Sequence, residues 1–188
     1  MAIACSPDVV ISPEQSNTAR LIASLRSREI DVAFIRPPVV DIEGLSIEPL
    51  VDEPMVIVLP ESHPRAGDRS MPLAALASDT IILFPRSIGP GLHDSIIASC
   101  HKAGLSPKLG QEASQTVSIV YMVAAGFGVS IVPQSLKQLH AGGVAYLQIE
   151  GEAPRALVSL AYRRGDRSTV VRNFVALARR AAQSQSLP

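Results

Sequence analysis

Apolar residues gather in short runs that alternate with helical patterns. Strand-forming runs predict strands over residues 9–11, 31–35, 45–50, 55–59, 80–84, 129–132, 144–149 and 156–162. Between them, apolar residues recur at helical spacing and predict helices over residues 18–28, 92–103, 114–125 and 168–182. The alternation of strands and helices indicates an α/β protein with a largely parallel sheet and helices on its faces.

The last predicted helix is amphipathic. One face carries Val170, Phe174, Leu177 and Ala181, and the arginines lie off that face. Acidic residues dominate residues 1–60, whereas arginines dominate residues 163–188. An arginine-rich end is also found in nucleic-acid patches, but a helix that covers a sheet explains this pattern better. If the helix packs on a sheet built from the acidic first segment, we expect opposite charges to meet at the rim.

Composition narrows the class of protein. The 188 residues are 47% hydrophobic and 18% charged with no net charge, which predicts a folded chain and gives no basic excess for DNA binding. No apolar run approaches the about 18 residues of a membrane span, and the start lacks the apolar stretch of a signal peptide. We therefore expect a cytoplasmic protein. The Pro- and Gly-containing residues 60–72 are a natural point for one lobe to pass into another.

The motifs of enzymes and metal sites are not found. His93, Asp94 and Ser95 are triad residue types, but neighbours on a helix point in different directions. Gly126 and Gly128 begin a dinucleotide-like motif whose third glycine position is Ile131, and a helix precedes the motif where a strand is needed. The histidines lack metal-ligand spacing, and Cys5 and Cys100 are interpreted as ordinary thiols. We expect no catalysis, metal or cofactor.

The sequence supports ligand binding better than it supports catalysis. Residues 15–18 and residues 86–91 are short polar or Gly-containing segments that precede two predicted helices. The start of a helix presents unpaired N–H groups and a partial positive charge, so a carboxylate is the ligand it accepts most readily. Simple capping of each helix is the alternative, but two such segments at the carboxyl ends of strands favour a ligand.

An ordered series of segments resembles the effector-binding domain of LysR-type transcriptional regulators. Beyond Leu25, the matching segments are residues 30–38, 45–50, 55–60, 62–64, 82–85 and 123–133. Residues 34–38 are most similar to the subgroup that senses compounds of aromatic catabolism. The resemblance extends over nearly the whole chain.

The resemblance implies two Rossmann-like α/β lobes joined by two crossover strands, as in periplasmic binding proteins. The crossovers are then residues 55–59 and 157–162, so that residues 1–57 and 160–188 form the first lobe and residues 58–159 the second. A small aromatic or dicarboxylic acid is expected in the cleft between them. The residues that match the family's ligand positions are Ser16, Asn17 and Thr18 in one lobe and Ser87, Gly89, Pro90 and Leu92 in the other, with Phe127 near the hinge side. The Thr18 hydroxyl and backbone donors are expected to bind the carboxylate, with Leu92 and Phe127 as apolar contacts.

The chain also departs from the family pattern. A full regulator begins with a winged helix-turn-helix and a linker helix, which have no counterpart here, so DNA is expected as a partner only through a missing domain. The family's domain opens with a strand and a helix ahead of the position that residues 6–9 match. Their loss implies an exposed sheet edge and an uncovered apolar face, hence a need for a partner or weak ligand binding.

The sequence thus predicts a non-catalytic, effector-sensing domain that forms homodimers or higher homo-oligomers. The second predicted helix and an edge strand are the expected contacts between copies. Two alternative functions stay open. The first is an enzyme on a similar two-lobed fold that uses His93 or Ser95, and the second is a solute-binding protein.

Overall fold

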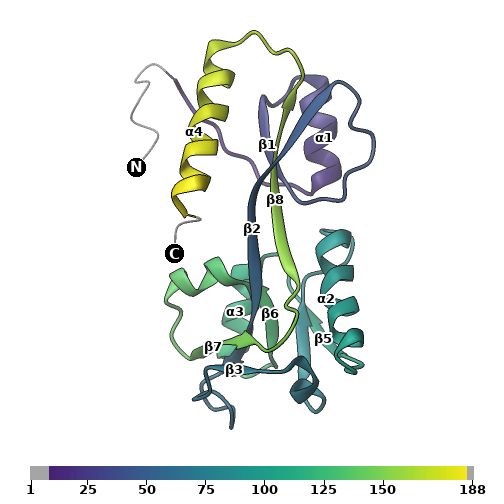
Figure 1. The fold of residues 1–188 in the computed structure, drawn as a ribbon, viewed down its shortest axis with the longest axis vertical. Coiled ribbons are helices and arrows are strands. Elements are labelled where there is room, and N and C mark those ends of the chain that lie inside the picture. The colour runs from purple at the N-terminus through teal and green to yellow at the C-terminus, as the bar shows by residue number, and fades with distance from the viewer. Residues whose placement is uncertain (1–8, 186–188) are drawn as a thin grey trace. The chain divides into compact units, whose positions relative to one another are not determined.

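The computed structural model describes residues 9–185; Cys5 and residues 6–8 of the family match lie outside the described residues. The chain divides into two compact units. Unit 1 comprises the chain up to Asp52 and from Leu157 onward, and unit 2 comprises Glu53–Ala156. The chain passes from unit 1 into unit 2 within the long strand β2 (Leu45–Pro60) and returns within β8 (Arg155–Arg163) (Figure 1).

Within the described residues, unit 1 contains three strands covered by two helices. After α1 (Thr18–Ser27) comes β1 (Val32–Ile35), and the sheet order is β1, β8, β2. β1 runs antiparallel to β8, with Val32 opposite Tyr162. The last helix is α4 (Thr169–Gln185). α1 and α4 lie on opposite sides of β1 and β8 (Figure 1).

Alternation along the strands explains the two helix layers of unit 1. Ala33 and Ile35 of β1 pack with Ile22 and Leu25 of α1. The intervening Val32 packs with Val171 and Val175 of α4 and with Leu160 of β8. The residues that α4 buries are one position along from the predicted stripe, since Val171, Val175 and Ala182 are buried while Val170 is 49% exposed. The predicted helix is therefore confirmed and its predicted buried face is wrong.

Opposite charges meet where α4 returns to the first segment. Arg179 donates to both carboxylate oxygens of Glu48, at 2.9 and 2.7 Å, and Tyr162 donates to the same carboxylate. These hydrogen bonds lower the pKa of Glu48, chiefly through Arg179. The expected ion pair at the rim is confirmed.

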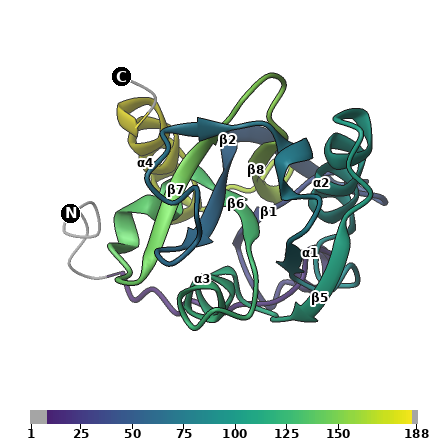
Figure 2. The same ribbon diagram turned by 90° about the horizontal axis from the view of Figure 1, so that it is seen from below.

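Unit 2 holds the remaining elements. In chain order they are β3 (Ser70–Met71), the 3-10 helix Leu73–Leu76, β4 (Thr80–Leu83), α2 (Pro90–Lys102), β5 (Lys108–Glu112), α3 (Thr116–Ala124), β6 (Ser130–Pro133), the 3-10 helix Gln134–Leu139 and β7 (Val144–Ile149). β2 pairs with β6 on one side and β7 on the other, and β3 extends the sheet beyond β7. Figure 2 shows β6 between β2 and α3.

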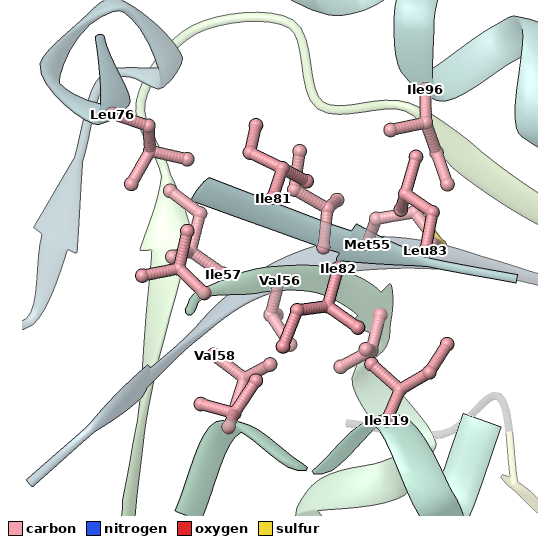
Figure 3. Close-up of a cluster of buried hydrophobic side chains, with 14 of the residues drawn as sticks. Met55, Val56, Ile57, Val58, Leu76, Ile81, Ile82, Leu83, Ile96 and Ile119 are labelled. Carbon is pink, nitrogen blue, oxygen red and sulfur yellow. The ribbon is translucent and has the colours of Figure 1, made fainter. Parts of the chain in front are cut away.

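One large apolar cluster fills unit 2. Met55, Val56, Ile57 and Val58 of β2 are wholly buried with Ile81–Leu83 of β4. Ile96 of α2 and Ile119 of α3 belong to the same cluster (Figure 3). Cys100 is also buried there, and burial raises the pKa of its thiol, which suits an inert core residue.

The expectation of a largely parallel sheet is wrong. β4, α2 and β5 form a strand–helix–strand unit whose strands are parallel. However, β1 pairs antiparallel with β8, and β2 pairs antiparallel with β6 and β7. The alternation constrains only strands that are consecutive in the chain, whereas these neighbours are separated by long stretches of sequence.

Three further strand predictions need correction. Residues 9–11 form no strand, residues 45–50 and 55–59 belong to the single strand β2, and β3 and β5 were not predicted. Every residue of β5 is exposed, and Leu109 is its single large apolar residue, so its sequence contains no apolar run that would predict a strand. Within residues 9–185, no helix combines the length and apolarity needed to span a membrane.

Gly128 is required by the packing of unit 2. Its φ is +154°, and a Cβ at this position would lie 2.3 Å from the backbone oxygen of Thr80. This close approach allows Val129 N–H to donate to Thr80 at 2.9 Å and the buried Ser130 hydroxyl to donate to the Ile82 carbonyl at 2.6 Å. The segment that resembles a dinucleotide motif therefore joins β6 to β4.

Candidate ligand-binding site

The first candidate segment is the start of α1 in unit 1. Asn17 is the N-cap, with an extended backbone and a side-chain oxygen that accepts a hydrogen bond from Arg20 N–H at 2.9 Å. This contact satisfies one of the unpaired N–H groups at the helix start. Ser16, the preceding residue, is half-buried. The Asn17 side chain is thus engaged in capping.

Thr18 ties this helix start to the end of β1. Its hydroxyl accepts from Arg36 N–H at 3.3 Å and lies 3.5 Å from the Arg36 carbonyl oxygen. Both distances are at the long end for hydrogen bonds. The contact places the first turn of α1 beside the backbone of Arg36, a cationic residue that is not among the predicted ligand positions.

The second candidate segment is the start of α2 in unit 2. Gly89 is the N-cap without a side-chain hydrogen bond, and Pro90 occupies the first turn. Helix geometry leaves the N–H groups of Gly89, Gly91 and Leu92 without intrahelical acceptors, and Pro90 has no N–H. Ser87 is exposed just before this turn. The α2 start therefore lacks the side-chain cap that Asn17 provides for α1.

At the start of α2, Leu92 and the backbone of Gly89 lie against the apolar core of unit 2. The Leu92 side chain is only 8% exposed and belongs to the apolar cluster of unit 2. A Cβ on Gly89 would lie 3.2 Å from the Phe84 ring, which packs edge-on against the imidazole of His93. The structure thus gives the Leu92 side chain a core position, and its backbone N–H remains the group at the helix start.

An ion pair that sequence reasoning missed lies at the same turn. Arg86 donates to both carboxylate oxygens of Asp94, each at 2.7 Å. This contact lowers the pKa of Asp94, with the hydrogen bonds from Arg86 as the largest cause. Residues 86 and 94 meet because the turn before α2 folds back on the helix, so their spacing alone gives no signal.

The triad residue types do not form a relay here. Nδ1 of the buried His93 lies 3.5 Å from an Asp94 oxygen and makes no hydrogen bond within the described residues. The Asp94 carboxylate is held instead by Arg86. Across residues 9–185, no group of three or more His, Cys, Asp or Glu is arranged to hold a metal ion.

Phe127 stands apart from the helix starts. It follows α3, its N–H donates to the Met122 carbonyl at 3.1 Å, and its side chain is 54% exposed. The predicted residues therefore form two groups, with Ser16, Asn17 and Thr18 in unit 1 and Ser87, Gly89, Pro90, Leu92 and Phe127 in unit 2.

Comparison with known proteins identifies the family. The model of the LysR substrate binding domain matches residues 4–183. The HTH-type transcriptional regulator BudR of Raoultella terrigena is 32% identical over 169 residues, which cover 90% of this chain and 58% of BudR. The uncharacterized HTH-type transcriptional regulator YnfL of Escherichia coli K12 is 30% identical over 169 residues, which cover 89% of this chain and 57% of YnfL.

A solved structure gives the same assignment. The effector-binding domain of QuiR in complex with shikimate superposes with a TM-score of 0.77 at 26% identity, covering 92% of this chain and 81% of that chain. This likeness confirms the expected two-lobed α/β fold, and the relatives' names agree with a regulatory rather than an enzymatic domain. The chain spans less than two thirds of the length of BudR and YnfL. The chain belongs to the LysR substrate-binding domain family.

Proposed function

We propose that this chain is the effector-sensing domain of a LysR-type regulator and that it binds a small organic acid at the helix starts of α1 and α2. The observation that carries the proposal is the start of α2, where the backbone N–H donors of Gly89, Gly91 and Leu92 have no side-chain cap. A carboxylate oxygen is the acceptor that such donors and the helix dipole favour. QuiR, which is 26% identical, is described in complex with shikimate, a carboxylic acid.

The proposed roles follow from the local structure. Ser87 and the Gly89–Pro90 turn contribute hydrogen-bond donors from unit 2, and Leu92 contributes its backbone N–H. Ser16, Asn17 and Thr18 contribute polar groups from unit 1, and Phe127 offers an exposed aromatic ring. An acid held by both units stabilises one angle between them, by no more than its difference in affinity for the alternatives.

A panel of acids tests the binding class. Shikimate, benzoate and succinate are added separately and the melting temperature is measured. A ligand that binds only the folded chain raises the melting temperature with concentration. At least one acid is expected to do so, and the methyl ester of the same acid is the control that lacks the anionic group. If no acid at high concentration changes the melting temperature, or if the ester acts equally, the proposal is wrong.

A substitution at Gly89 tests the site directly. Gly89→Asp places an internal carboxylate at the N-cap, where it competes for the N–H donors that the acid needs. Affinity for the acid is expected to fall by about 10-fold or more, equivalent to about 1.4 kcal/mol. Gly89→Ala is the matched control, because it adds the same Cβ against Phe84 without the carboxylate. Equal affinities of the two variants in titration calorimetry would place the acid elsewhere.

Single substitutions in each unit test whether both helix starts act on one ligand. Thr18→Val and Ser87→Ala each remove a hydroxyl and are expected to weaken binding by about 1–3 kcal/mol. Ser12→Ala, at an exposed position before α1, is the control. An effect of Ser87→Ala without any effect of Thr18→Val would restrict the ligand to unit 2 and assign Thr18 to anchoring α1.

The activity of the longer protein is also a proposal. By analogy with relatives named as HTH-type regulators, the domain acts in the cytoplasm as a homodimer or higher oligomer and controls DNA binding by a separate domain. Expression of the open reading frame that contains this sequence, followed by a DNA mobility-shift assay with and without the acid, tests this. No acid dependence of DNA binding would contradict it.

A further inference from the structure

His63 lies in the loop of residues 61–69, which joins β2 to β3. Most residues of this loop are exposed, whereas the His63 side chain is only 15% exposed. Two turns fix its backbone, because its N–H donates to the Pro60 carbonyl and its own carbonyl accepts from Ala66 N–H, each at 2.9 Å. The imidazole is therefore held in a partly enclosed position within unit 2.

The contacts of the two ring nitrogens define the tautomer of His63. Arg65 N–H donates to Nδ1 at 3.1 Å. A ring nitrogen that accepts a hydrogen bond carries no proton, so the neutral ring has its proton on Nε2. Nε2 lies 3.4 Å from Oδ1 of Asp79, in the turn that precedes β4. One ring thus joins a turn of its own loop to the start of β4.

Asp79 presents an incompletely paired carboxylate to this ring. Its side chain is 18% exposed, and Oδ2 is buried without a hydrogen-bond partner among the described residues. Its N–H donates to the Leu76 carbonyl at 3.0 Å, and β4 begins at the next residue, so its backbone position is fixed. A carboxylate withdrawn from water is unfavourable without hydrogen bonds or a nearby positive charge. A charged imidazole would supply that positive charge.

The other charged groups around this contact are exposed or paired elsewhere. The charged residues of the loop are Glu61, Arg65, Asp68 and Arg69. Arg65 donates to Asp68 at 2.7 Å, and both side chains are more than a third exposed. On the neighbouring strand, the exposed Lys108 of β5 lies opposite Thr80, where β4 begins. Arginine, lysine and carboxylate side chains ordinarily keep their charge between about pH 5 and 8, whereas histidine changes its charge in that range. His63 is therefore the group of this contact that responds to pH near neutrality.

We propose that His63 is a pH-dependent switch that exchanges one contact for another. In the neutral form Nδ1 accepts from Arg65 N–H, and the turn of residues 63–65 is closed. When a proton from solvent binds Nδ1, the ring can no longer accept a hydrogen bond, so the bond to Arg65 N–H is lost. The ring also gains a positive charge, which strengthens its attraction to Asp79. Acidification therefore opens the turn within the loop and anchors the ring more firmly to the start of β4.

NMR spectroscopy of the isotope-labelled chain tests the exchange. Long-range proton–nitrogen correlations of the His63 ring are expected to show a proton on Nε2 alone at about pH 8 and on both nitrogens at about pH 5. Over the same range, the amide-exchange protection factor of Arg65 should fall several-fold, because its hydrogen bond is lost. His63→Asn is the matched control, since its amide oxygen offers an acceptor near the position of Nδ1 and does not titrate. Protection of Arg65 should stay constant with pH in this variant.

Two outcomes of this experiment would overturn the switch. One is a neutral ring that carries its proton on Nδ1, because the bond from Arg65 N–H would then be absent from the start. The other is a loss of Arg65 protection that is equally large in His63→Asn, because the change would then not depend on protonation of the ring.

Asp79→Asn tests the second half of the exchange. Removal of the carboxylate charge is expected to move the midpoint of the His63 ring titration to lower pH, since the charged ring loses its partner. His101, exposed on α2, is the internal control, and its titration should not change. An unchanged His63 midpoint in Asp79→Asn contradicts the pairing. These measurements are made without any acid ligand, so their failure leaves the proposed function untouched.

Discussion

The two units are stabilised in different ways. Unit 2 encloses one continuous apolar cluster drawn from β2, β4, β6, β7, α2 and α3. Unit 1 divides its buried residues between two smaller clusters, one under α1 and one under α4, with a three-stranded sheet between them. Each small cluster includes residues of β1, the terminal strand in the sheet of the described residues. Unit 1 therefore has less apolar burial per element and depends more on polar contacts.

Arginine side chains supply many of those contacts. Arg163 of β8 donates to the carbonyl oxygens of Leu25 and Ile30 and to the carboxylate of Asp31. Arg179 of α4 bridges to Glu48 of β2. These bonds join the last part of the chain to the first part across long sequence separations. Salt and pH should therefore affect unit 1 more than unit 2.

The largest difference is expected from equivalent core truncations. Ile57→Ala in unit 2 should lower the free energy of unfolding by about 4 kcal/mol, whereas Ile35→Ala in unit 1 should lower it by about 2 kcal/mol. Both side chains are buried, but Ile57 belongs to the large continuous cluster of unit 2, where we expect little collapse around a cavity, and Ile35 belongs to a small cluster on the terminal strand β1. Urea unfolding followed by circular dichroism measures both. Equal losses would show that the cores are equally rigid.

The next effect concerns the tight contact between β4 and β6. Gly128→Ala should destabilise the chain by about 3 kcal/mol, because its Cβ would overlap the Thr80 carbonyl oxygen and its φ is one that L residues rarely adopt. Gly126→Ala is the matched control, since its φ is +80° and nothing lies within 4 Å of the added Cβ, so about 1 kcal/mol is expected. Thermal unfolding of both variants measures the difference. Similar losses would mean that backbone conformation, rather than the close approach, requires Gly128.

Local patterns predicted most elements but could not decide their partners. The helices were predictable because their apolar spacing and end residues are local features. In α4, however, Val170, Phe174 and Leu177 form one apolar stripe and Val171 and Val175 another, so periodicity alone cannot choose the buried one. Contact with Leu160 and Val32 makes that choice. Residues 9–11 have strand composition but form no strand, because a strand also needs a neighbour.

The candidate site was likewise predictable in its local features but not in its tertiary contacts. The polar and Gly-containing segments marked both helix starts, since capping chemistry is local. The spacing could not show that the Leu92 side chain is buried or that Arg86 meets Asp94, because both depend on how α2 packs and how the preceding turn folds back. The contact of Thr18 with Arg36 likewise requires α1 and β1 to be adjacent.

A smaller effect is expected from the arginine that joins the two ends of unit 1. Arg163→Met should lower the free energy of unfolding by about 2 kcal/mol, because it leaves the carbonyl oxygens of Leu25 and Ile30 without their donor while keeping most of the apolar bulk. Arg65→Met in unit 2 is the control, since Arg65 pairs with the exposed Asp68 three residues away and should contribute less than about 0.5 kcal/mol. Hydrogen exchange should show loss of protection in α1 and β1. Equal effects of the two variants would remove the contrast between the units.

The smallest effect is expected at Glu48, and its dependence on pH gives a specific test. Glu48→Gln should cost about 1 kcal/mol near neutral pH, because it removes the paired charge of Arg179 at a partly exposed position. The pKa of Glu48 in the folded chain lies below its ordinary value of 4.5, so its contribution is fully present above that pH and is lost as the pH falls through the folded value. The difference in stability between wild type and Glu48→Gln should therefore shrink on acidification, and it should also shrink with added salt. Thermal unfolding across this pH range measures the difference, with Glu112→Gln on the exposed strand β5 as control. A difference that stays constant through the acid range would show that the Glu48 charge contributes nothing and that unit 1 relies on its apolar clusters after all.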